Sequence, residues 1–165
     1  MDRRVITLIV AAAVAVALVA VVLIAQNSGG GSSGGGSGDI TDTSTKPDVE
    51  VPSGAPPKTL VKKEVVVGDG SEAKPGDTVK VQYVGVLYNN GKQFDASWDR
   101  NQPFSFQLGG GQVIPGWDQG VEGMRVGGRR ELIIPPDLGY GAQGAPPDIP
   151  PNATLVFVID LLAVQ

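Results

Sequence analysis

The chain has 165 residues, which is enough for one domain of ordinary size plus extensions. It contains no cysteine and no histidine, which excludes disulfides, thiolate or imidazole catalysis and the common zinc sites. The net charge is -4 and there is no basic cluster beyond Arg129 and Arg130, so we expect no nucleic-acid partner, and we expect neither a metal nor a cofactor.

Residues 1–25 have the features of a membrane segment. Arg3 and Arg4 precede an apolar run from Val5 to Ala25 that is interrupted only by Thr7. At about 1.5 Å per residue the run spans about 31 Å, close to the thickness of the hydrocarbon core of a bilayer. The arginines favour a cytoplasmic N-terminus, so the rest of the chain is expected outside the cytoplasm. The sequence predicts a single-pass transmembrane anchor in the cell membrane or, if residues 1–25 are cleaved as a signal peptide, a secreted domain.

Residues 26–57 are predicted to be a flexible linker. The part from Gly29 to Gly38 contains only glycine and serine, and residues 39–57 are polar and contain prolines without apolar periodicity. Such segments bury too little apolar surface to offset the loss of chain entropy on folding. The folded domain is therefore expected over residues 58–165.

The first half of this domain is predicted to consist of strands. Residues 60–67 are rich in valine and end at a glycine turn. Residues 78–88 alternate: one face is apolar and the other carries Lys80 and Gln82. The apolar, inward face holds Val79, Val81, Tyr83, Gly85 and Leu87. Asn89-Asn90-Gly91 is a hairpin signal, because a tight turn needs residues that tolerate positive φ. The next strand should therefore pair antiparallel with residues 78–88 and carry Gln93, Phe94 and Asp95.

The second half combines strands with one short helix. Residues 103–108 alternate again, and the glycine-rich stretch Gly109–Gly120 should enter a helix at Pro115, with Trp117 facing inward. Further strands are expected at residues 129–134, where we place Arg130 and Leu132 on opposite faces, and at residues 154–164. The predicted fold class is α+β, with a curved antiparallel sheet around one short α-helix.

Several large side chains that lie far apart in the sequence are expected to converge on one site of the folded domain. They are Tyr83, Phe94, Phe104, Val113, Ile114, Trp117, Tyr140 and Phe157. The loops around them are rich in glycine and proline, which favours a cavity open at one end. An ordinary hydrophobic core would gather the same residues.

Five segments, in this order and spacing, resemble the FKBP-type peptidyl-prolyl cis-trans isomerases. They are residues 81–85, 91–95, 113–117, 140–142 and 149–155. The resemblance covers residues 58–165 and implies a half-barrel sheet wrapped around a short helix, with isomerase activity. It also implies the substrate-binding residues Tyr83, Phe94, Asp95, Arg100, Phe104, Gln112, Val113, Ile114, Trp117, Tyr140, Ile149 and Phe157.

The resemblance further implies roles for these residues. Catalysis would fall to Asp95, Tyr83, Tyr140 and Phe94. The proline ring would stack on Trp117. The Ile114 N–H and the Tyr140 hydroxyl would hold substrate carbonyls, and Asp95 would interact with Tyr83 and Arg100.

Some interpretations stay open at this stage. Asp95 is either part of the pocket or only an ion-pair partner of Arg100, and the helix residues Asp118, Glu122 and Arg125 read as a solvated face. The sequence departs from the family pattern at Ala145, where many members carry histidine, and at Asp148, where an apolar residue is common. Both positions are expected at the pocket rim.

The sequence therefore predicts a peptidyl-prolyl isomerase that accelerates X-Pro bond rotation in exported proteins. The barrier to this rotation is about 18–20 kcal/mol and no bond is broken, so the reaction needs neither a nucleophile nor a metal. The expected partners are proline-containing polypeptides and macrolide inhibitors of the FKBP type, and the expected state is a monomer. The alternative is a tethered module or holdase chaperone that binds proline segments, with only incidental turnover.

Overall fold

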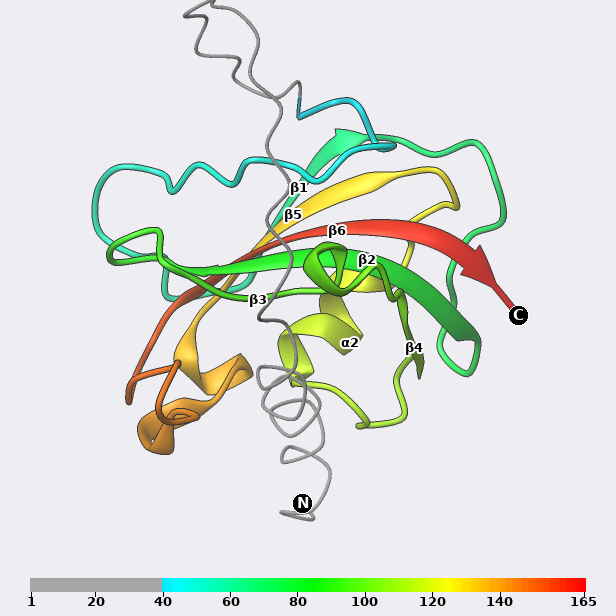
Figure 1. Ribbon diagram of the computed structural model, residues 1–165. Helices are drawn as coiled ribbons and strands as arrows, with labels where there is room; N and C mark the ends of the chain where they lie inside the picture. The colour runs from blue at the N-terminus through cyan, green and yellow to red at the C-terminus, as the bar shows by residue number, and fades with distance from the viewer. Residues whose placement is uncertain (1–39) are drawn as a thin grey trace, which may run out of the picture.

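The computed structural model describes residues 40–165 (Figure 1). The predicted membrane segment 1–25 and the glycine-serine part of the predicted linker lie outside the described residues. Within residues 40–165, no helix is long and apolar enough to cross a membrane.

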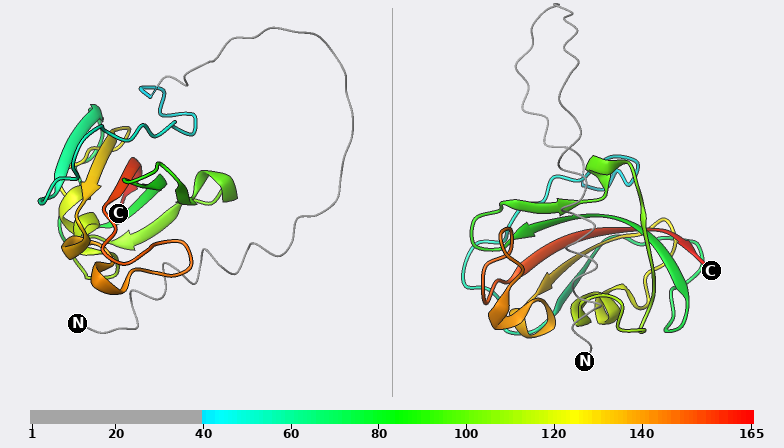
Figure 2. Two further views of the ribbon diagram at one scale, coloured as in Figure 1. Left: turned by 90° about the vertical axis from the view of Figure 1, so that its left-hand side faces the viewer. Right: turned by 60° about the horizontal axis from the view of Figure 1, so that its bottom comes forward.

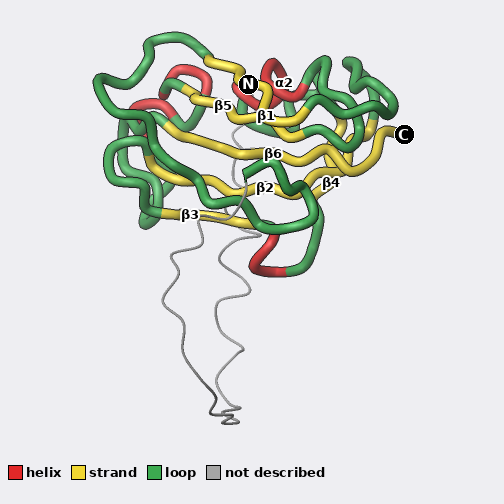
Figure 3. Tube along the Cα trace, turned by 90° about the horizontal axis from the view of Figure 1, so that it is seen from above, coloured by secondary structure: helices red, strands yellow, loops and turns green. Residues whose placement is uncertain are grey.

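The domain is a curved antiparallel sheet with one α-helix on its concave face, as predicted (Figure 1). Figure 3 shows the strand order β1-β5-β6-β2-β3, and β4 also pairs with β2 to give six strands. The strands are β1 (Val61–Val66), β2 (Thr78–Leu87), β3 (Gln93–Ala96), β4 (Phe104–Gln107), β5 (Arg129–Ile134) and β6 (Leu155–Val164). The α-helix is α2 (Pro115–Val121), and the 3-10 turns are η1 (Trp98–Arg100), η2 (Pro136–Leu138) and η3 (Gly141–Gln143).

Strand β2 is long enough to pair with two short strands in succession. Its first half pairs with β4, with Val79 opposite Phe106, and its second half pairs with β3, with Gly85 opposite Asp95. The turn between β2 and β3 contains Gly91 at φ 69°, the conformation that the hairpin signal required. The chain segments before and after η1 therefore lie along the same edge of β2, one on each half of that strand.

The helix packs directly on β5 because two glycines face that strand. A Cβ atom on Gly116 would lie 2.5 Å from the Ile134 side chain, and one on Gly120 would lie 2.4 Å from the Leu132 side chain. Both contacts are closer than carbon atoms can approach, so only glycine fits at these positions. With the glycine side of the helix against β5, Trp117 is buried in the concave core.

Arg130 lies on the helix side of β5, the same side as Leu132, so the prediction that these two residues face opposite ways is wrong. Residues two apart on a strand share a face. The Arg130 Nη1 donates to the carbonyl oxygens of Gly120 at 2.6 Å and Glu122 at 2.9 Å, which are the unpaired acceptors at the end of α2.

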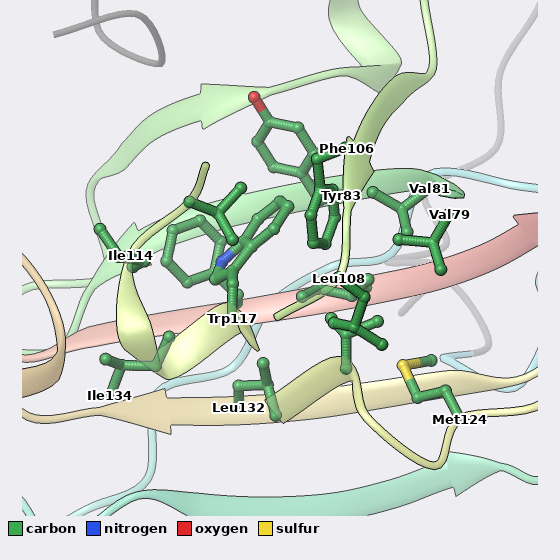
Figure 4. Close-up of a cluster of buried hydrophobic side chains, with 14 of the residues drawn as sticks. Val79, Val81, Tyr83, Phe106, Leu108, Ile114, Trp117, Met124, Leu132 and Ile134 are labelled. Atoms are coloured by element: carbon green, nitrogen blue, oxygen red, sulfur yellow. The ribbon is translucent and has the colours of Figure 1, made fainter. Parts of the chain in front are cut away.

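The core between the sheet and the helix holds most of the aromatic rings. Figure 4 shows Trp117 in the middle of this cluster, with side chains from β2, β4 and β5 around it. Trp117, Phe106 and Phe157 are all nearly inaccessible to solvent. The predicted inward alternation of residues 78–88 is confirmed, since Val79, Val81, Tyr83 and Leu87 all belong to this cluster.

The convex face of the sheet carries a second apolar cluster. Its buried members are Val84, Val86, Tyr88, Ala96, Ile133 and Val156. Val49 and Val51 pack on it from a segment that crosses the convex side (Figure 1, cyan; Figure 3). We call residues 40–57 the strap.

The prediction of a flexible linker is therefore wrong for the strap. Arg129, which is fully buried, donates from Nη1 to the carbonyl oxygens of Ile40 at 2.9 Å and Asp42 at 3.1 Å. Its Nη2 donates to the carbonyl of Thr45 at 2.9 Å, while the same guanidinium pairs with Asp160. The strap binds through backbone carbonyls, two valines and the Lys46–Asp99 ion pair, and none of these leaves a periodic signal in the sequence.

Asp160 is buried and forms an ion pair with Arg129. Burial raises the pKa of its carboxyl, and the hydrogen bonds from Arg129 oppose that shift. The Arg129–Asp160 pair thus satisfies two buried polar groups of the sheet and leaves three guanidinium donors for the strap.

Candidate active site

The concave face opens at one end into a pocket between β2, β3, α2 and the loops around η2 and η3. Figure 2 shows these loops beside the sheet, in orange. The pocket is lined by Tyr83, Phe94, Asp95, Phe104, Ile114, Trp117, Tyr140, Ala145, Asp148, Ile149 and Phe157. The residues come from segments that are far apart in the chain, as the sequence predicted.

Trp117 forms the base of the pocket and is held by rings on several sides. Its ring centroid lies 5.0 Å from that of Tyr83 and 5.2 Å from that of Phe157, with interplanar angles of 80° and 87°. Phe94 meets Phe157 at 5.4 Å and 86°. Such edge-to-face contacts favour fixed ring positions. The aromatic walls are therefore in place before a ligand arrives.

Gly85 makes room for two of these walls. A Cβ atom at this position of β2 would lie 2.6 Å from the Phe157 ring and 2.7 Å from the Phe94 ring. Any side chain there would push both rings toward the pocket. The sequence placed Gly85 on the inward face, but the reason for a glycine becomes visible only when both rings are located.

One edge of the pocket carries a connected polar trio. The Tyr83 hydroxyl donates to Asp95 Oδ2 at 2.5 Å, and Arg100 Nη1 donates to Asp95 Oδ1 at 2.5 Å. Arg100 Nη2 also donates to the Tyr83 hydroxyl at 3.0 Å. The Asp95 side chain is only 10% exposed, so the pair with Arg100 compensates a charge that is largely removed from water. Asp95 is thus both an ion-pair partner of Arg100 and a residue that lines the pocket.

The environment of the trio keeps the Tyr83 hydroxyl protonated. Burial is the main cause that raises the pKa of Tyr83 well above its usual range, and the Asp95 charge adds to it. Figure 4 shows that this hydroxyl points away from the buried cluster. Tyr83 therefore acts as a hydrogen-bond donor at the boundary between core and pocket.

The buried Trp117 Nε1 has no acceptor among the described residues. Two further donors at the pocket, the Tyr140 hydroxyl and the Ile114 backbone N–H, also appear in none of the hydrogen bonds of residues 40–165. Burial and the Asp95 charge raise the pKa of Tyr140 to about 12, so this hydroxyl also stays protonated at neutral pH. Both donors are free to bind carbonyl oxygens of a ligand.

Three predicted site residues do not line the pocket. Arg100 acts on it through Asp95 and Tyr83. Gln112 is exposed, and its Oε1 accepts a hydrogen bond from the Gln107 N–H at 2.9 Å. Val113 is buried in the core behind the pocket. Positions 112 and 113 precede the helix, and the sequence pattern could not show which way each side chain turns.

Asp118 has a structural role that the sequence reading missed. Its carboxylate accepts hydrogen bonds from the N–H groups of Gly109 at 2.8 Å and Gly111 at 3.1 Å. It therefore holds the glycine loop against the first turn of α2, and is not simply part of a solvated face. This contact fixes the direction in which the chain enters the helix, and with it the position of Trp117.

A second hollow lies between the strap, the turn at Tyr88–Gly91 and the loop at Pro150–Thr154. Tyr88 is its only aromatic lining residue within the described part of the chain, and no charged side chain lines it. It lacks the combination of rings, carboxylate and free donors that distinguishes the first pocket. We therefore take the pocket at Trp117 as the candidate active site.

Among the described residues, no serine, threonine or lysine lines this aromatic pocket, which suits a small domain that binds or isomerises a ligand without a covalent intermediate. The sequence model of one family, FKBP-type peptidyl-prolyl cis-trans isomerase, matches residues 70–162. The chain therefore belongs to the FKBP-type peptidyl-prolyl cis-trans isomerases, and the enzyme class predicted from the sequence is confirmed.

Known proteins similar to this chain include small bacterial ones. An FK506-binding protein of Streptomyces anulatus is 58% identical over 120 residues, which are 72% of this chain and 97% of the relative. A probable FK506-binding protein of Corynebacterium glutamicum is 48% identical over 118 residues, which are 72% of this chain and 98% of the relative.

Solved structures share the fold. The crystal structure of FkpA from Escherichia coli has a TM-score of 0.58 and 48% sequence identity, and the match covers 64% of this chain and 48% of that one. The crystal structure of AtFKBP13 has a TM-score of 0.60 and 44% identity, and the match covers 64% of this chain and 93% of that one.

The similarity extends into the strap. The match to the Streptomyces anulatus protein covers 72% of this 165-residue chain, which is about 119 residues, so the matched part begins no later than about residue 47. Nearly the whole of that relative is matched. The Streptomyces anulatus protein has little sequence outside the match, and it thus has a counterpart of part of the strap.

Proposed function

We propose that this isomerase binds the proline of an X-Pro bond in the pocket, with the proline ring against Trp117, and lowers the barrier to rotation there. One observation carries this proposal. A pocket of fixed aromatic rings contains free donors and a carboxylate that is already neutralised by Arg100. It is therefore largely apolar, yet it offers hydrogen bonds at its edge.

The chemistry of the amide explains why such a pocket accelerates rotation. A planar amide has a charge-separated resonance form that water stabilises, and a twisted amide is less dipolar. Transfer into the apolar pocket therefore costs the planar ground state more than the twisted transition state. Hydrogen bonds that fit the twisted geometry better add to this difference.

The polar groups of the pocket have separate roles in this mechanism. The Tyr140 hydroxyl and the Ile114 N–H hold the carbonyl groups that flank the proline, because neither donor is used within residues 40–165. Asp95, fixed by Tyr83 and Arg100, presents a carboxylate edge near the rotating bond. Phe94 and Phe157 close the sides of the pocket.

The experiment that tests this proposal is an NMR exchange measurement of an Ala-Pro peptide with the full chain. We expect the wild type to accelerate cis-trans exchange and Phe94→Ala to lose most of that acceleration, because it opens one wall of the pocket. Leu162→Ala is a matched control, since Leu162 is 39% exposed and lies outside the pocket. Peptide binding without acceleration would favour the alternative, a module or holdase that only retains proline segments.

We propose, further, that the domain works outside the cytoplasm on exported proteins, as a monomer tethered by residues 1–25. The support is the apolar run that follows Arg3 and Arg4. Cell fractionation with added protease tests it, because a tethered external domain is membrane-bound and cleaved in whole cells. A shortened soluble product outside the cells would show that the segment is removed, and a protected cytoplasmic product would contradict the proposal.

A further inference from the structure

Asp148 places an unpaired carboxylate at the mouth of the pocket. It lines the pocket together with Asp95, but the two residues differ in their surroundings. Asp95 is largely buried and paired with Arg100. Asp148 is exposed, and it makes no ion pair or hydrogen bond within residues 40–165. Its negative charge is therefore available to a ligand.

The loop that carries Asp148 is held in place by its backbone. Ala145 N–H donates to the Ile149 carbonyl at 2.8 Å, and Ile149 N–H donates to the Ala145 carbonyl at 3.0 Å. These two bonds close the loop on itself, and both end residues line the pocket. Asp148 thus sits on a closed loop at the rim, between two residues that contact the same cavity.

The charges around the pocket leave the Asp148 carboxylate uncompensated. No lysine or arginine occurs in residues 101–124 or 131–165, the two stretches that supply most of the lining. Arg100 is engaged by Asp95, and Arg129 and Arg130 pair with Asp160 and Glu64. A cleft with one sign of charge and apolar walls concentrates its field at the opening.

We propose that Asp148 makes this isomerase prefer prolines that are flanked by lysine or arginine. The inference rests on the proposed function, because it assumes that the proline occupies the pocket. A flanking cation would lie at the rim near Asp148, while a flanking carboxylate would meet like charge there. Asp148 is accordingly a specificity residue and takes no part in the rotation itself.

The test compares Lys-Pro, Ala-Pro and Glu-Pro peptides of otherwise identical sequence with the full chain. We expect kcat/KM to be about fivefold higher for Lys-Pro than for Glu-Pro at low salt, a ratio typical of one exposed charge at close range. Added salt should reduce this ratio, because the rim is exposed to solvent. Asp148→Asn should remove most of the ratio, and Asp148→Lys should invert it.

Asp137→Asn is the matched control. Asp137 is an exposed acid in η2 that does not line the pocket, so its loss should leave the order of the peptides unchanged. Equal rates for Lys-Pro and Glu-Pro with the wild type would overturn the inference, and so would an unchanged order of the peptides with Asp148→Lys. In either case, acceleration of Ala-Pro exchange would leave the proposed function standing. If even Ala-Pro were not accelerated, the proposed function would fail and this inference with it.

Discussion

The Tyr83 hydroxyl lies 2.5 Å from Asp95 Oδ2, and this contact joins the core of the domain to its pocket. The Tyr83 ring is held by an edge-to-face contact with Trp117, and the Asp95 carboxylate is held by Arg100. A carboxylate held in this way has one orientation. The pocket therefore presents a defined polar edge although most of its lining is apolar.

Asp95→Asn tests this arrangement. We expect kcat/KM for an Ala-Pro peptide to fall about tenfold, because the polar edge loses its charge. The free energy of unfolding should fall by about 1–2 kcal/mol, since Arg100 loses its partner while remaining partly buried. Glu72→Gln is the control, because it removes one partner of the exposed Arg125–Glu72 pair and should change stability by less than about 1 kcal/mol. Equal activity of Asp95→Asn and the wild type would remove Asp95 from the site.

Gly85→Ala tests the space behind the aromatic walls. The added methyl group would meet the Phe94 and Phe157 rings at distances below 3 Å, so both rings must move. We expect a loss of about 1–3 kcal/mol in the free energy of unfolding, as is usual for overpacking. Peptide affinity should fall as well, because the rings are displaced into the pocket. Unchanged chemical denaturation and unchanged peptide binding would contradict the assigned role of this glycine.

Removal of the strap tests whether the folded unit begins before residue 58. A chain that starts at residue 58 loses Val49 and Val51 from the convex cluster and three carbonyl acceptors from Arg129. We expect it to be about 2–4 kcal/mol less stable than a chain that starts at residue 40, mainly from lost apolar burial. Urea unfolding of the two chains measures this difference. Equal midpoints would show that the strap contributes nothing to stability.

The raised pKa values of the pocket tyrosines predict that the protein loses stability at alkaline pH. The pKa of Tyr140 is raised to about 12, above the value of about 10 for an unfolded chain, so the native state keeps its proton where the unfolded state loses it. The contribution of Tyr140 to the free energy of unfolding is fully present below pH about 10 and is lost as the pH rises toward about 12. Tyr140→Phe should therefore show a smaller loss of stability across that interval, measured by urea unfolding. An identical pH dependence in both proteins would contradict the raised pKa.

Much of the fold could be predicted because local pattern and tertiary environment agree in β2 and α2. The alternation around Tyr83 gives the inward face of β2, and Pro115 marks the start of α2. Most of the pocket was also predicted, on the resemblance of five segments to one family. Here the residues that form the site are also the residues that carry the family pattern.

The remainder depended on contacts between distant segments. Nothing near Arg129 in the sequence indicates that its guanidinium binds carbonyls of the strap, which are more than 80 residues away. The outward side of β2 read as polar from Lys80 and Gln82, but its second half is covered by Val49 and Val51. Backbone acceptors and an isolated pair of valines carry no periodicity, so only the folded structure reveals them.

The central claim is that the proline ring of the substrate rests on Trp117. The chain has two tryptophans, and Trp98 packs with the convex cluster on the other face of the sheet. We would measure intermolecular nuclear Overhauser effects between the ring protons of a bound proline peptide and each indole. Contacts to Trp117 and none to Trp98 are predicted. Contacts to Trp98 alone, or to neither indole of a peptide-saturated protein, would contradict the account.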